Sequence, residues 1–179
     1  MNIFKKIDGK LYEWYLKTLA DEGNAEKMTD LGICYIEGSN NIKQNTELGL
    51  HWLKKAISNG YPKAMYFLGN YYINGIGGVE QDYKKGVELL TRCVFHNDAA
   101  AYLSLALCYR DGKGVQQSIP LFLHCLKQSA KLGNSVISKL LYEIYLEGTY
   151  AEPDVREANK WLRLYWDQIR NKNNDCNCN

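Results

Sequence analysis

Apolar positions along this chain recur three and four residues apart, the spacing that places them on one face of an α-helix. Four stretches with this spacing align, and each is closed by a glycine: 24–38, 61–75, 98–112 and 134–148. Within them a leucine and a tyrosine stand at matching positions: Leu31, Leu68, Leu105 and Leu141, and Tyr35, Tyr72, Tyr109 and Tyr145. The closing glycines are 37, 37 and 36 residues apart. Such a fixed period predicts an array of structural repeats.

Each aligned stretch predicts the first helix of a repeat, because its final glycine can adopt the left-handed conformation that ends a helix. A short loop follows, and then a residue type suited to capping the N-terminus of a second helix. These N-caps are Asn45, Asp82, Ser118 and Asp154. The second helices are expected to run to Gly60, Asn97, Gly133 and about Ile169. Every repeat is therefore a helix hairpin.

The N-terminal segment, residues 8–23, matches a second helix without its first. Tyr15 lies 37 residues before Trp52, and Gly23 lies 37 residues before Gly60. One leading helix and four hairpins give about nine helices in an all-α fold. A lone repeat cannot bury its apolar face, so neighbours are expected to stack into a single domain over 8–169. Its parts are the leading helix 8–23, the repeats 24–60, 61–97, 98–133 and 134–169, and then a polar, disordered tail at 170–179.

Composition excludes several classes of protein. The net charge is only +2 and its signs are mixed, so we expect no nucleic-acid partner. No stretch approaches the roughly 18 apolar residues of a membrane span, so we expect no membrane partner. Lys5 and Lys6 precede no apolar run, and Glu13 and Asp21 interrupt any signal-peptide core. The chain is therefore predicted to be cytoplasmic.

The six cysteines are interpreted as reduced thiols, because no export signal accompanies them. Four lie within predicted helices, where a buried thiol acts as a small apolar group: Cys34, Cys93, Cys108 and Cys125. Cys176 and Cys178 lie in the polar tail. Two soft ligands on such a tail are too few to predict a metal site, so we expect no metal and no cofactor.

No constellation of residues in the sequence predicts catalysis. His51 and His124 occupy the same repeat position two repeats apart. His124 and Cys125 are neighbours in one helix, so their side chains point about 100° apart and form no nucleophile pair. Gly75–Gly78 opens no strand-to-helix phosphate turn and is better explained as the loop of the repeat. We expect no enzyme, and a hydrolase is the least favoured alternative.

The repeat pattern resembles the Sel1-like repeat, a relative of the tetratricopeptide repeat with a slightly longer loop. The second repeat matches best, with Ala64, Leu68-Gly69, Tyr72, Gly75-Ile76-Gly77-Gly78-Val79, Asp82 and Tyr83-Lys84-Lys85. Ala106 and Tyr142 stand where the first two repeats have a helix-packing glycine. Phe122 stands at a second-helix position where the other three repeats have glycine or alanine. In an exported branch of this family, paired cysteines join successive helices. Cys93 matches the first cysteine of such a pair, but Tyr102 stands at the position of the second, which argues that the chain does not belong to that branch.

This resemblance implies a right-handed superhelical solenoid of helix hairpins that works as an adaptor or scaffold through protein contacts. In such arrays the first helices line a concave inner surface. At about 100° per residue, the repeated columns occupy one arc of the first helix and leave the opposite arc free. The predicted partner-binding residues on the free arc are Ile33, Ile36, Glu37, Tyr66, Asn70, Ile73, Asn74, Leu103, Leu107, Arg110, Asp111, Lys139, Glu143 and Leu146.

Apolar side chains rimmed by charges on a free arc are typical of a binding surface for a protein or peptide. The alternative is a superhelix so tight that these side chains pack on one another. Two functions fit the binding interpretation: a general adaptor, which we favour, and an immunity-type inhibitor that neutralises one toxin or effector. The sequence predicts a monomer or an end-to-end dimer, the latter through terminal aromatic residues: Trp14, Trp161, Tyr165 and Trp166.

Overall fold

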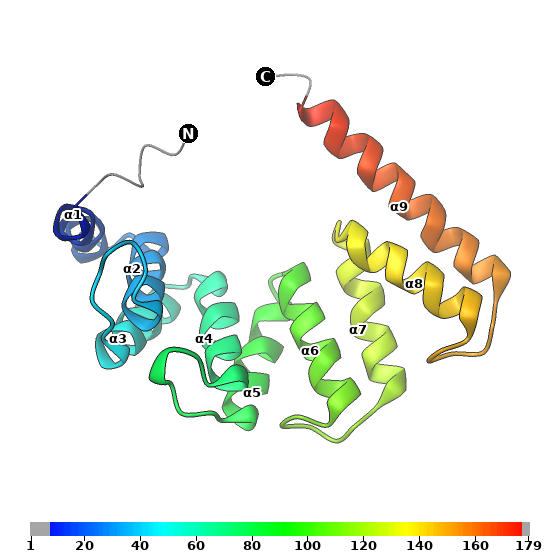
Figure 1. Cartoon of the computed structure of the whole chain (residues 1–179), viewed down its shortest axis with the longest axis horizontal. Helices are drawn as coiled ribbons and strands as arrows, with labels where there is room; N and C mark the ends of the chain where they lie inside the picture. Colours follow the sequence, from blue (N-terminus) through cyan, green and yellow to red (C-terminus); the bar gives the residue numbers. More distant parts are fainter. Residues whose placement is uncertain (1–7, 177–179) are drawn as a thin grey trace. The chain divides into compact units, whose positions relative to one another are not determined.

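A computed structural model describes residues 8–176, with side chains described through residue 173. Over this range the chain forms nine α-helices and one short 3-10 turn, with no strand (Figure 1). Their bounds are α1 (Gly9–Asp21), α2 (Ala25–Glu37), α3 (Thr46–Ser58), α4 (Pro62–Asn74), η2 (Ile76–Gly78), α5 (Tyr83–Val94), α6 (Ala99–Asp111), α7 (Ile119–Lys131), α8 (Ser135–Glu147) and α9 (Val155–Cys176). The predicted all-α fold of helix hairpins is confirmed.

The predicted glycine ends of the first helices and the predicted N-caps of the second helices are confirmed by backbone geometry and hydrogen bonds. The glycine after each first helix is left-handed, with φ between 64° and 78°, a conformation that costs glycine little: Gly38, Gly75, Gly112 and Gly148. The side chains of Asn45, Asp82 and Ser118 accept hydrogen bonds from backbone amides in the first turns of α3, α5 and α7. Asp154 does the same for α9, from the amides of Arg156 and Glu157.

One hydrogen bond recurs in the loop of all four hairpins. The backbone N–H of the N-cap residue donates to the carbonyl oxygen of the repeated tyrosine, and the N···O distance is 2.8–2.9 Å in each case. The pairs are Asn45 with Tyr35, Asp82 with Tyr72, Ser118 with Tyr109, and Asp154 with Tyr145. In the first three repeats a glutamine before the N-cap also donates to a carbonyl at the end of the first helix: Gln44, Gln81 and Gln117. These bonds fix where the second helix starts relative to the first.

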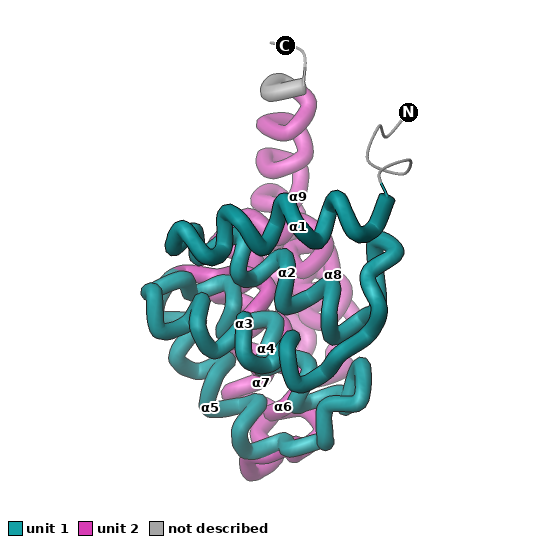
Figure 2. Tube along the Cα trace, turned by 90° about the vertical axis from the view of Figure 1, so that its left-hand side faces the viewer, with its two compact units in different colours: residues 1–96 teal, residues 97–179 magenta. Residues whose placement is uncertain are grey.

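The chain separates into two compact units, Met1–His96 and Asn97–Asn179 (Figure 2). The boundary lies one residue before the predicted junction between the second and third repeats. Unit 1 contains α1 to α5, and unit 2 contains α6 to α9.

The prediction of a disordered tail from residue 170 is wrong for residues 170–176, which continue α9. Two side chains join this part of the helix to the rest of unit 2. Gln168 Nε2 donates to the carbonyl of Ala130 at 2.7 Å, and Lys172 Nζ to the hydroxyl of Ser135 at 3.3 Å. The predicted end of the last helix was based on apolar positions alone, so it took no account of these polar contacts. Residues 177–179, with Cys178, lie outside the described residues, as does the side chain of Cys176.

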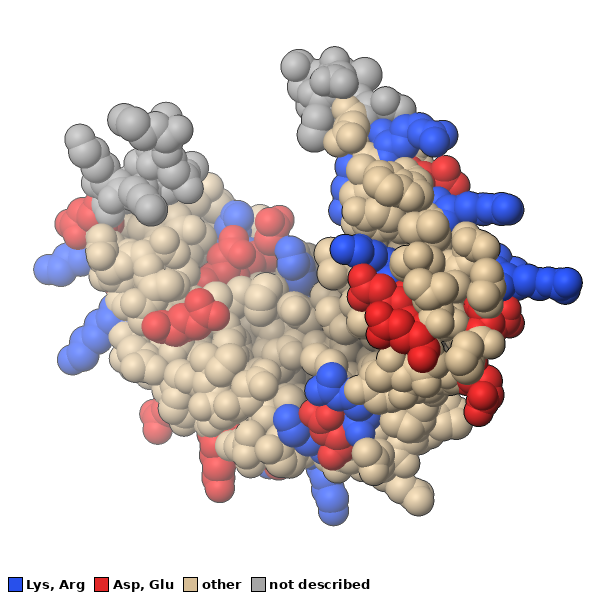
Figure 3. All heavy atoms as spheres, turned by 45° about the vertical axis from the view of Figure 1, so that its right-hand side comes forward, with Lys and Arg blue, Asp and Glu red and all other residues tan. Residues whose placement is uncertain are grey.

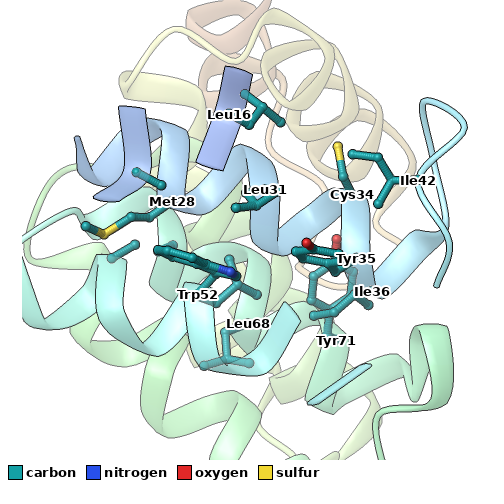
Figure 4. Packing of buried hydrophobic residues seen from close by; sticks show 14 of the residues in the cluster. Leu16, Met28, Leu31, Cys34, Tyr35, Ile36, Ile42, Trp52, Leu68 and Tyr71 are labelled. Atoms are coloured by element: carbon teal, nitrogen blue, oxygen red, sulfur yellow. The ribbon is translucent and has the colours of Figure 1, made fainter. Parts of the chain in front are cut away.

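The core of unit 1 is built from the repeated columns (Figure 4). Leu31 and Leu68 are buried, and Leu16 of α1 closes the core above α2. Two tyrosine hydroxyls link neighbouring helices: Tyr35 donates to the Glu13 carboxylate, and Tyr71 donates to Glu37 Oε1 at 2.8 Å. Neighbouring helices of this unit are therefore joined by apolar packing and by hydrogen bonds to carboxylates.

Paired glycines allow the hairpin helices of unit 1 to approach closely. A Cβ added to Gly49 would lie 2.8 Å from the Gly32 carbonyl oxygen, and one added to Gly86 would lie 2.8 Å from the Gly69 carbonyl oxygen. In unit 2 the Gly49 position is taken by Phe122, which is buried and packs edge-to-face on Tyr150 with 5.0 Å between ring centroids. The larger side chain of Phe122 is thus accommodated by packing against an aromatic residue of the following loop.

We predict that Gly49→Ala destabilises the protein by about 1–3 kcal/mol, because the added methyl group overpacks the α2–α3 contact. Urea denaturation of the purified variant measures this difference. Lys54→Ala, on the exposed side of the same helix, serves as the control and should change stability by less than about 0.5 kcal/mol. Equal stability of Gly49→Ala and the parent chain would contradict the close approach.

Candidate functional site

Two of the predicted partner-binding residues are buried in unit 1. Ile36 is 0% exposed and Ile73 is 8% exposed, so neither is available to a partner, and these two predictions are wrong. Each isoleucine lies four residues after a helix-packing glycine and fills the space beside a second-helix glycine, Gly49 or Gly86. The η2 loop also covers Ile36, because the Gly77 backbone lies against it. Both isoleucines were assigned to the free arc because a rotation of about 100° per residue gives the direction of a side chain but not how closely the second helix approaches it.

The other predicted residues of unit 1 remain accessible on α2 and α4. Glu37 and Asn74 are exposed, while Ile33, Tyr66 and Asn70 are half-buried. Three of them are held in place by hydrogen bonds: Glu37 by the Tyr71 hydroxyl, Asn70 by the Tyr66 carbonyl, and Asn74 by the Asn70 carbonyl. Unit 1 therefore presents a mainly polar first-helix face with Tyr66 and Ile33 as its apolar members.

The predicted residues of unit 2 lie on α6 and α8, and none is fully buried. Leu107 is 40% exposed and Leu146 is 45% exposed, while Leu103 is half-buried. We call the exposed surface formed by these residues and their charged neighbours on α6 and α8 the unit 2 first-helix face. The charged members are Arg110, Asp111, Lys139 and Glu143.

The charges on the unit 2 first-helix face are paired within each helix. Arg110 Nε donates to Asp111 Oδ1 at 2.7 Å, and Lys139 Nζ lies 3.8 Å from Glu143 Oε1. Such exposed pairs add little to stability, but they fix charges of both signs beside the leucines. On the face of the molecule in Figure 3, positive and negative side chains likewise lie next to one another in small groups.

Sequence reasoning missed one apolar residue on α8. Leu140 is exposed, and it lies one turn after Val136, which is 73% exposed. Leu146 is also exposed, but it lies about 120° from Leu140 around α8, and Lys139 and Glu143 lie between them on the exposed side of the helix. Leu140 was missed because its repeat position carries Asp30, Phe67 and Ser104 in the other repeats, so the repeat pattern assigns it no consistent environment.

No metal-binding cluster is found among residues 8–173. Three or more His, Cys, Asp or Glu side chains nowhere converge there on a point where a metal ion would bind. His51, His96 and His124 are exposed and lie on different helices or loops. Within the described part of the chain, no helix has the length and apolar character needed to span a bilayer.

Four described cysteines are buried: Cys34, Cys93, Cys108 and Cys125. Burial raises the pKa of the Cys108 thiol to about 11, and it does the same for Cys125. Burial also raises the pKa of Tyr71, with a further contribution from its hydrogen bond to Glu37. The Cys108 and Cys125 thiols are therefore protonated at neutral pH and are poor nucleophiles.

Comparison with protein families agrees with the hairpin geometry. The Sel1 repeat model matches four segments: 28–61, 62–92, 98–134 and 143–164. Together these cover more than half of the chain. The chain belongs to the Sel1 repeat family. Sel1 repeats generally act as non-enzymatic modules that bind protein partners, and the resemblance inferred from the sequence is confirmed.

Solved structures of Sel1 repeat proteins share the fold. A protective antigen of uropathogenic Escherichia coli with an SLR fold is 26% identical, with a TM-score of 0.76, over 87% of this chain and 33% of its own. A Sel1 repeat protein from Oxalobacter formigenes is 25% identical, with a TM-score of 0.76, over 89% of this chain and 64% of its own. This chain thus spans a third of one relative and less than two thirds of the other.

An immunity protein from Pseudomonas aeruginosa is also similar, with 16% identity and a TM-score of 0.53 over 87% of this chain and 73% of its own. At that identity the likeness concerns the fold alone. No curated protein matches the chain significantly.

We predict that the free energy of unfolding falls as pH rises from about 9 to 11. An unfolded cysteine ionises near pH 9, whereas folded Cys108 and Cys125 hold their protons to about pH 11. Their contribution to stability is therefore complete below pH 9 and is lost as pH rises through 11. Urea denaturation at stepped pH measures the fall, which should be smaller in the Cys108→Ala/Cys125→Ala variant. An equally steep fall in that variant would show that the thiols are not responsible.

Proposed function

We propose that this chain is a non-enzymatic adaptor that binds a partner protein or peptide through the outward faces of its first helices. The observation that supports this most directly is the unit 2 first-helix face, where Leu107 and Leu146 are exposed beside paired charges. Exposed apolar side chains surrounded by charges are typical of protein-binding surfaces. Membership in the Sel1 repeat family supports the same class of function.

The exposed side of α8 is the strongest part of this surface. Val136, Leu140 and Leu146 share one side of a helix whose other side is buried through Leu141 and Ile144. Three large apolar side chains on the solvent side are not needed to hold α8 in the hairpin. We therefore propose that they contact the partner, while Lys139 and Glu143 set its orientation through their charges.

The first-helix face of unit 1 is proposed to contribute a different kind of contact. Tyr66 is half-buried and presents an aromatic ring, a side chain often found among the energetically dominant residues of interfaces. Glu37, Asn70 and Asn74 are already oriented by hydrogen bonds within the protein, so little side-chain entropy is lost when a partner binds them.

We predict that Leu107→Asp/Leu146→Asp weakens partner binding by about tenfold or more, because it places two charges where apolar contact is expected. The partner is first identified by photo-crosslinking in the native cell, with the photoreactive amino acid at position 107. Its affinity for the parent chain and the variant is then measured with both proteins purified. Tyr66→Ala, measured in the same way, reports the contribution of unit 1.

Leu121→Asp is the matched control, because Leu121 is 44% exposed but lies on the second helix α7. This variant should bind as the parent chain does. Unchanged binding by the double variant with an intact helical spectrum would refute the proposed surface. A single crosslinked partner that is a toxin, inactivated on binding, would replace the adaptor by the immunity-type inhibitor.

A further inference from the structure

Unit 1 contains a groove on its second-helix side, away from the first-helix faces discussed above. Its volume is about 250 Å³, its floor is formed by α4, and its walls are formed by α3 and α5. The apolar lining comes from all three helices: Ile57 of α3, Leu68 and Tyr72 of α4, and Leu89 of α5. We call this hollow the α3–α5 groove. An apolar floor between two helix walls has the form of a peptide-binding groove.

Cations dominate the rim of the α3–α5 groove. Lys54, Lys85 and Arg92 line it, and Glu88 is the one acidic residue among them. Lys85 is paired with Asp82 at 2.8 Å and lies over the Tyr72 ring, 5.7 Å from its centroid. Lys54 and Arg92 form no ion pair with any described residue. Two unpaired cations beside apolar surface are complementary to a ligand that combines carboxylates with apolar side chains.

A second hollow extends the groove along α5. It has a volume of about 320 Å³ and shares Tyr72 and Lys85 with the first. Leu50 and Val79 add apolar lining, and Glu80 and Asp82 add two carboxylates beside the N-terminus of α5. The combined length runs from Asp82 to Arg92, which are ten residues apart and therefore roughly 15 Å apart along the helix axis. A helical segment of about ten residues has this length.

The equivalent place in unit 2 shows that unpaired cations are not a general property of this repeat. There a hollow of about 410 Å³ is lined by Lys127, Lys131 and Lys160, with Trp161 and Leu164 as apolar surface. Counted from the N-cap, Lys127 corresponds to Lys54, while Glu157 corresponds to Lys85. Glu157 accepts a hydrogen bond from Lys160 at 2.7 Å and lies 3.8 Å from Lys127. Glu157 therefore neutralises two of the three cations, Lys127 and Lys160.

We propose that the α3–α5 groove binds an acidic, amphipathic segment of about ten residues from a partner protein. Apolar side chains of the segment lie on Ile57, Tyr72 and Leu89, and its carboxylates pair with Lys54 and Arg92. This surface is separate from the first-helix faces of the proposed function. The chain therefore has a second place at which a protein is bound.

The test uses the full-length chain and a labelled synthetic peptide of about ten to fourteen residues, with leucines three and four apart and glutamates between them. Fluorescence polarisation measures its affinity at low salt and at about 0.15 M salt. We expect Lys54→Glu/Arg92→Glu to weaken binding by about tenfold or more. A second peptide with lysine in place of every glutamate should bind this variant better than it binds the parent chain.

Lys127→Glu/Lys131→Glu is the matched control, because it reverses two cations of the equivalent hollow in unit 2. It should leave the affinity within about twofold. Equal weakening by both double variants would overturn the proposal in favour of non-specific attraction between charges. It would also be overturned by unchanged affinity of a peptide with serine in place of leucine, or by equal binding of a single-stranded oligonucleotide of the same charge. None of these outcomes involves Leu107 or Leu146, so the proposed function is tested separately.

Discussion

The hydrogen bond from the N-cap amide to the tyrosine carbonyl determines how the two helices of each repeat are arranged. It has the same 2.8–2.9 Å length in all four loops, although the loops differ in sequence and one has proline where the others have glutamine. Because this bond fixes where the second helix starts, it also fixes which side chains of the first helix face the second. The outward arc of every first helix, and hence every candidate binding residue on it, depends on that arrangement.

The size of the side chain on the second helix decides which outward positions of the first helix are accessible to a partner. In unit 1, glycine on the second helix leaves a space that Ile36 or Ile73 fills, so an isoleucine near the outer edge becomes part of the core. In unit 2, Phe122 supplies its own volume at the glycine position, and Arg110 stands where the isoleucine would be. The same position is therefore buried in one unit and half-accessible in the other.

The number of helices, the ends of the first helices and the N-caps of the second helices could be predicted from the sequence, because each depends on local residues such as Gly38 and Asn45. The first-helix face could be predicted in part, since the 3.6-residue period gives the direction of a side chain but not the distance to the next helix. That distance depends on glycine pairs such as Gly32 and Gly49. Leu140 and the α3–α5 groove could not be predicted, because their accessibility depends on contacts between helices that vary among the repeats.

Repetition of the backbone also explains how equivalent surfaces can differ in charge without any change of fold. Each hairpin loop is held by the repeated hydrogen bond from the N-cap amide to the tyrosine carbonyl, so second-helix positions near the surface contribute little to folding. Lys85 and Glu157 occupy one such position and both form an ion pair with a neighbour one turn away on the same helix. Yet Glu157 also approaches Lys127 on the facing helix, whereas Lys85 leaves Lys54 unpaired. The charge at this one repeat position thus separates the two hollows. In unit 2 Glu157 neutralises two of the three cations, whereas in unit 1 Lys54 and Arg92 are available to a ligand.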